Sequence, residues 1–76
     1  MKYQLRLSDH GASGLEYQFY LIHPQTGVSN ALPPRNLIIR FGELWDFAKV
    51  SGGIIENSPD YVWFVLDEEF NLLGIL

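Results

Sequence analysis

Cysteine is absent from this chain of 76 residues, and so is any long apolar run. Without cysteine, the domain can have neither disulfide bonds nor thiolate ligands for a metal. No stretch approaches the roughly 18 apolar residues of a membrane-spanning helix. The N-terminus alternates polar and apolar residues and lacks the run of roughly 7–15 apolar residues found in signal peptides. We therefore expect a cytoplasmic protein, which agrees with the lack of cysteine.

Positive charge is also scarce. The chain has 5 Lys and Arg against 9 Asp and Glu, for a net charge of −4, and the whole surplus lies in residues 35–76. A protein that binds nucleic acid needs the opposite imbalance, with basic side chains clustered on one face. We therefore expect a soluble acidic domain that has neither a nucleic acid nor a membrane as its partner.

Patterns typical of catalytic or metal sites are missing as well. Asp9, His10 and Ser13 share one glycine-containing loop, but a catalytic triad is assembled from positions held apart in the fold, and turns select these residue types. His10 and His23 are the only histidines, and neither lies in a local zinc-binding spacing. Asp67–Glu69 lacks the alternating oxygens and central glycine of a calcium loop and suits a solvated turn. We expect no catalytic, metal or cofactor site, and no enzyme.

Aromatic side chains are the informative part of the composition. There are 2 Trp, 4 Tyr and 5 Phe in one short chain. A single core in a domain of this size is marginal, and each aromatic side chain buries roughly 150–250 Å². We therefore expect residues 1–76 to form a single globular domain around a core rich in aromatics. The expected core residues are Leu5, Leu7, Tyr17, Phe19, Leu44, Trp45, Ala48, Trp63 and Phe64.

Period-two alternation predicts two antiparallel hairpins. Residues 2–8 and 16–22 alternate, and the glycine-containing loop between them joins them as a first hairpin. Residues 61–66 are apolar on both faces, which favours a strand in the centre of a sheet or at an interface. Residues 72–76 return after the turn at 67–71 as the last strand. Between the helix and this hairpin lie the apolar pair Ile54-Ile55 and a turn at 57–60.

The middle of the chain is less regular. Six residues that disfavour regular structure fall within eleven positions and predict a loop over residues 23–35: Pro24, Gly27, Ser29, Asn30, Pro33 and Pro34. Residues 36–50 have two interpretations. Their apolar residues recur at helical spacing, which favours one long helix. Alternatively residues 37–41 form a strand and the helix begins near Gly42, because a glycine inside a helix costs roughly 1 kcal/mol. We prefer the second interpretation.

These elements add up to an α+β fold with a small, mostly antiparallel sheet, ββ(β)αββ, and one helix packed on one face. One helix cannot cover both faces, and an apolar, aromatic-bearing face that stays uncovered marks an interaction surface. On the strand at 61–66, which is apolar on both faces, either Tyr61 and Trp63 or Val62 and Phe64 lie on this surface. The candidate partner surface consists of Tyr20, Ile22, Tyr61, Trp63, Leu73 and Ile75. The alternative is that the 23–35 loop covers this face with Val28, Ala31 and Leu32, since loops of that length often pack on something.

The function that we expect is a small, non-catalytic protein–protein interaction or regulatory module that forms a homodimer. Self-association through a sheet face or edge would add partner contacts to a core that is marginal alone. One alternative is an accessory subunit of a larger complex, whose apolar face a different protein covers. Another is a small enzyme or ligand-binding domain that uses the 9–14 and 24–34 loops as pocket walls.

Overall fold

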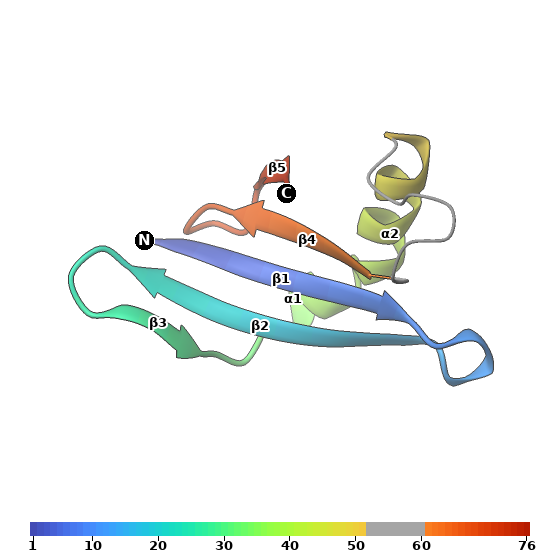
Figure 1. Ribbon diagram of the computed structural model, residues 1–76, viewed down its shortest axis with the longest axis horizontal. Helices are drawn as coiled ribbons and strands as arrows, with labels where there is room; N and C mark the ends of the chain where they lie inside the picture. Colours follow the sequence, from blue (N-terminus) through green and yellow to red (C-terminus); the bar gives the residue numbers. More distant parts are fainter. Residues whose placement is uncertain (52–60) are drawn as a thin grey trace.

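The computed structural model describes residues 1–51 and 61–76, which form one twisted sheet with helices on one side (Figure 1). The elements in chain order are β1 (Lys2–Asp9), a 3₁₀ turn (Gly11–Ser13), β2 (Leu15–His23), β3 (Gly27–Asn30), α1 (Arg35–Ile38), α2 (Phe41–Val50), β4 (Tyr61–Leu66) and β5 (Leu72–Ile75). The predictions for Ile54-Ile55 and for the turn at 57–60 lie outside the described residues. The α+β fold with an antiparallel sheet and a helical layer on one face is confirmed.

The first strand lies in the middle of the sheet, whose order is β3-β2-β1-β4-β5. Both predicted hairpins are present, since β1 pairs with β2 and β4 pairs with β5, each antiparallel. The two hairpins join through β1 and β4, where Leu5 lies opposite both Phe19 and Phe64. Strand β4 is therefore an inner strand, as its apolar character on both faces predicts.

The prediction that residues 23–35 form a loop is wrong, because Gly27–Asn30 forms β3 and pairs with β2. The prolines lie on either side of these four residues, and Gly27 is the first of them. Gly27 has a φ of 86°, which favours glycine, and this conformation helps close a tight turn after His23. The backbone N–H groups of Gln25 and Thr26 donate to His23 Nδ1 at 3.1 and 3.3 Å. The turn therefore ends one strand and starts the next.

The preferred interpretation of residues 37–41 as a strand is also wrong. Residues 35–38 form α1, and α2 begins at Phe41 after a bend at Arg40. The helical spacing decides the structure here: the apolar side chains at 37, 41, 44, 45 and 48 are all buried. Their burial outweighs the cost of Gly42 in the first turn of α2.

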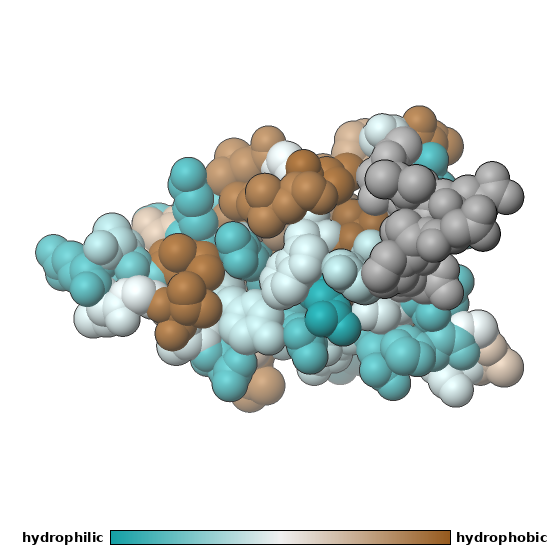
Figure 2. Space-filling view, in the orientation of Figure 1, coloured by the Kyte–Doolittle hydropathy of each residue, from teal (hydrophilic) through white to brown (hydrophobic). Residues whose placement is uncertain are grey.

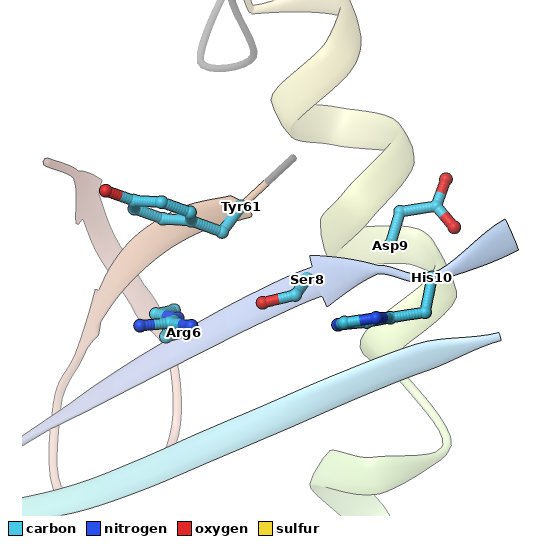
Figure 3. A pocket seen from close by; sticks show the side chains of 5 residues that line it. All are labelled: Arg6, Ser8, Asp9, His10 and Tyr61. Carbon is cyan, nitrogen blue, oxygen red and sulfur yellow. The ribbon is translucent and has the colours of Figure 1, made fainter. Parts of the chain in front are cut away.

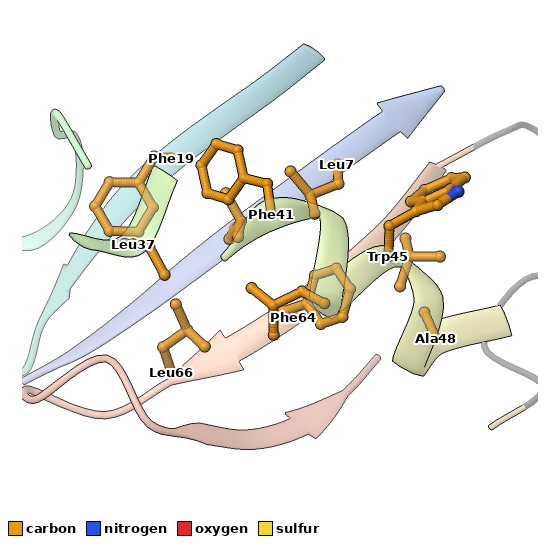
Figure 4. Close-up of a cluster of buried hydrophobic side chains, with 11 residues drawn as sticks. Leu7, Phe19, Leu37, Phe41, Trp45, Ala48, Phe64 and Leu66 are labelled. Carbon is orange, nitrogen blue, oxygen red and sulfur yellow. The ribbon is translucent and has the colours of Figure 1, made fainter. Parts of the chain in front are cut away.

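The core fills the space between the helices and one face of the sheet (Figure 4). Of the expected core residues, all are buried except Tyr17, which is 43% exposed, and Trp63, which is half-buried on the other face of the sheet. Tyr17 lies at the rim, with its ring centroid 5.4 Å from that of Phe41. The complete buried set is Leu5, Leu7, Phe19, Leu37, Phe41, Leu44, Trp45, Ala48, Val62, Phe64 and Leu66.

The turn between β4 and β5 contributes one aromatic side chain, Phe70, to the edge of this core. Phe70 has a φ of 66°, an uncommon conformation for a residue with a side chain. Its ring packs at 4.9 Å from Tyr3 and 6.3 Å from Phe19, and its carbonyl accepts a hydrogen bond from Arg40 Nη1 at 3.2 Å. The aromatic contacts and the link to the helical segment offset the backbone strain.

Shortening Leu44 to alanine should lower the free energy of unfolding by about 2–5 kcal/mol, the usual cost of a cavity left by leucine. Phe47→Ala is the matched control, because Phe47 lies on the same helix but is 48% exposed. It should cost less than about 1 kcal/mol. Equal losses in the two variants, measured by chemical denaturation, would contradict the assigned inward face of α2.

The acidic turn gives the fold a pH-dependent contribution. The backbone N–H of Asn71, together with the Asn71 side chain and the Glu69 N–H, donates to the Asp67 carboxylate and holds the pKa of that carboxyl below its ordinary value. A carboxyl with a depressed folded-state pKa stabilises the fold above its unfolded pKa of about 3.9. That contribution is lost as the pH falls through the lower, folded-state pKa.

Asp67→Asn should therefore destabilise the domain most at neutral pH, and the difference from the wild type should shrink as the solution is acidified. Denaturation midpoints measured over a pH series check this. Glu69→Gln is the control, since it removes a neighbouring carboxylate and leaves the bonds to Asp67 in place. A difference between wild type and Asp67→Asn that stays constant down to strongly acid pH would contradict the role of the Asp67 charge.

Candidate functional site: the open face of the sheet

One face of the sheet is left uncovered by every element that the structure describes. The helices lie behind the sheet in Figure 1, and Figure 2 shows the opposite side, where separate hydrophobic areas lie among weakly polar and hydrophilic ones. Because successive strand side chains alternate between faces, the register fixes which residues point this way. This open face consists of Lys2, Gln4, Arg6, Ser8, Glu16, Gln18, Tyr20, Ile22, Val28, Asn30, Tyr61, Trp63 and Val65.

The alternative in which the 23–35 segment folds over this face is wrong. Val28 belongs to β3, opposite Ile22, and it is 66% exposed. Ala31 packs instead against the core on the helix side, and Leu32 is 89% exposed. The segment widens the sheet by one strand, so the open face becomes larger rather than covered.

An aromatic pair occupies the centre of the open face. Tyr20 lies opposite Gln4, and Trp63 lies opposite Arg6, so the two rings come from the strands on either side of β1. They meet across β1 with ring centroids 6.0 Å apart and an interplanar angle of 29°. The Tyr20 hydroxyl donates to Gln18 Oε1 at 3.1 Å. The pair is held in place by its neighbours and presents a flat apolar area with a polar margin.

Ile22 and Tyr61 extend this face in opposite directions. Ile22 lies opposite Lys2 and Val28, beside a shallow apolar hollow of about 190 Å³ that Met1 and Pro24 also line. Tyr61 lies opposite Ser8 at the other end. Four of the six predicted surface residues therefore share one face: Tyr20, Ile22, Tyr61 and Trp63.

The other two predicted residues lie elsewhere. Ile75 pairs with Phe64 and packs against the core on the helix side, so it is not available to a partner on the open face. Leu73 lies at an irregularity in the β4–β5 register, on the outer strand, and is 54% exposed. The bulge shifts the alternation by one residue, which explains why a strict period-two pattern misplaces these two side chains.

Arg6 is the residue of this face that the sequence analysis missed. Its guanidinium carbon lies 4.8 Å from the centre of the Tyr61 ring, within cation–π range. Its Nε is buried and has no hydrogen-bond partner among the described residues. A buried, unsatisfied donor costs about 1–3 kcal/mol. The sequence contained one signal for this residue: Arg6 lies on the solvent-facing side of the first strand, between the polar residues Gln4 and Ser8.

Asp9 and His10, in the loop after β1, make local contacts. Asp9 Oδ1 accepts a hydrogen bond from the Gly11 N–H at 2.8 Å, and His10 Nε2 lies 3.3 Å from Glu16 Oε2. Across residues 1–51 and 61–76, no three His, Asp or Glu side chains are grouped so that they could hold a metal ion. None of the described helices is long and apolar enough to cross a membrane.

Comparisons with protein-family models, curated proteins and solved structures found no match.

Proposed function

We propose that this protein is a small, non-catalytic protein–protein interaction module that docks through the open face of its sheet, and that the partner on this face is a second copy of the chain. The observation that carries the proposal is the stacked Tyr20–Trp63 pair at the centre of an uncovered sheet face. A soluble domain rarely leaves a contiguous apolar patch exposed unless the patch binds something.

The composition of the face supports a protein partner. Protein interfaces have an aromatic-rich centre and a polar rim. Here Gln4 lies between Tyr20 and Val65 on the central strand, and Gln18 and Asn30 border Tyr20 on its outer side. Aromatic anchors of this kind contribute much of the binding free energy when a partner removes them from water.

The size and layering of the domain support a second copy. The molecule extends 37 × 22 × 18 Å, so its broad side matches the roughly 800 Å² that each partner contributes to a standard interface. Domains are built from layers that bury both faces of a sheet, and the helices here supply only one layer. In a two-fold dimer the same patch meets itself, which would place one aromatic pair against the other.

We expect a dimer at micromolar concentration, and Tyr20→Lys should raise its dissociation constant by about tenfold or more because it places a charge in the apolar centre. Phe47→Lys is the control, since it adds the same charge to the exposed outer side of α2 and should leave the dimer intact. Sedimentation velocity measures both.

A folded monomer at millimolar concentration would reject self-association. A dimer that resists Tyr20→Lys and yields to Leu73→Lys would move the contact from the face to the β5 edge. Ile75→Lys cannot serve for the edge, because Ile75 packs against the core and a lysine there would destabilise the fold.

A further inference from the structure

A second feature lies at one end of the open face, where β1 ends and β4 begins. There Arg6, Ser8, Asp9, His10 and Tyr61 line a hollow of about 280 Å³ (Figure 3). The Arg6 guanidinium carbon lies 4.8 Å from the centre of the Tyr61 ring, so this cation–π contact restricts the side chain. A guanidinium held in this way loses little freedom when it binds a ligand, because its planar fork is already oriented.

The charge of Arg6 is not neutralised by the described residues. Their two ion pairs join the N-terminus to Glu68 and His10 to Glu16, and neither includes Arg6. Among the described residues, Asp9 is the only carboxylate that lines the hollow. Figure 3 shows it directed away from Arg6 and Ser8, and its Oδ1 accepts the Gly11 N–H. Within the part of the chain that the structure describes, the hollow therefore presents the positive charge of Arg6 beside Ser8 and Tyr61, with no anion paired to it.

We infer that this hollow is a binding site for a carboxylate group, which the Arg6 guanidinium holds by paired hydrogen bonds. Arginine and carboxylate match in planar, bidentate geometry, and such charge-assisted bonds are stronger than neutral ones. Ser8 belongs to the same lining, and its hydroxyl can donate a further hydrogen bond.

The charge balance favours a carboxylate over a phosphate. One guanidinium offsets one negative charge, whereas a phosphate carries about −1.5 to −2 at neutral pH. The excess would lie close to Asp9 and Glu16, in a protein whose net charge is −4. The carboxylate has two possible sources, an acidic side chain of a protein partner and a free organic acid. This inference does not depend on self-association.

The test is an NMR titration of the ¹⁵N-labelled full chain with three probes at constant pH and ionic strength: blocked glutamate (N-acetylglutamate methylamide), acetate and inorganic phosphate. We expect saturable shifts of the Ser8 and His10 amides and of the Arg6 Nε–H with both carboxylates. If blocked glutamate binds more tightly than acetate, the natural ligand is an acidic side chain. If acetate binds as tightly as blocked glutamate or more tightly, the natural ligand is a free organic acid. Tighter binding of phosphate, or no saturable shift with either carboxylate, would overturn the inference.

Arg6→Gln should weaken carboxylate binding by about tenfold or more, the scale of a lost charge-assisted bond. Lys2→Gln is the matched control, because it removes the same charge from the same face and should have little effect. Arg6→Lys keeps the charge and loses the fork, so it should also weaken binding, and it remains usable if Arg6→Gln does not fold. Equal effects of Arg6→Gln and Lys2→Gln would overturn the site. The same titration is repeated on Tyr20→Lys, the variant expected to weaken the dimer. Carboxylate binding that persists in this variant shows that the hollow binds the ligand whether or not the protein self-associates.

Discussion

The pairing of β1 with β4 is the contact on which the rest of the structure depends. It joins residues 3–8 to residues 61–66, which are far apart in the sequence, and it turns two separate hairpins into one sheet. On one side it brings Leu5 and Leu7 against Phe64, at the centre of the core. On the other side it places Arg6 next to Trp63, so one register builds both the core and the open face.

The helical layer adds a second constraint. The bent helix of α1 and α2 buries five apolar side chains against one face of the sheet, and the chain between β2 and α1 contributes a strand in place of a cover. The opposite face keeps an aromatic pair and a stacked arginine at its surface. Both proposals follow from this difference between the two faces. We propose that a second copy covers the apolar centre of the open face, and that a carboxylate binds the arginine.

Local patterns were sufficient for the parts of the fold that alternate strictly. The burial of Leu5, Leu7 and Phe19 followed from period-two alternation. The pattern failed where the chain is irregular. The density of prolines and glycines concealed β3, whose four residues begin with Gly27 and lie between Pro24 and Pro33, and the weight given to Gly42 concealed α1. In both places tertiary contacts decide the structure: β3 forms because it pairs with β2, and the helical segment forms because it buries Leu37 and Phe41.

The candidate site was predicted in part for the same reason. Tyr20 was placed on the surface because it alternates with core residues, whereas the apolar character of residues 61–66 on both faces left the face of Trp63 undecided. The bulge between β4 and β5 moved Ile75 to the core side, and no local pattern marks a bulge of this kind. Arg6 was missed because its importance comes from Tyr61, which lies beside it only through the pairing of β1 with β4.

The fluorescence of Trp63 as a function of protein concentration tests the central claim most directly, namely that a second copy covers the open face. Trp45→Phe leaves Trp63 as the single tryptophan and keeps an aromatic ring in the core. We predict emission typical of a partly exposed indole at low concentration, shifting to shorter wavelength as the protein is concentrated through the dimerisation range. Emission that stays constant from nanomolar to millimolar concentration would contradict the account.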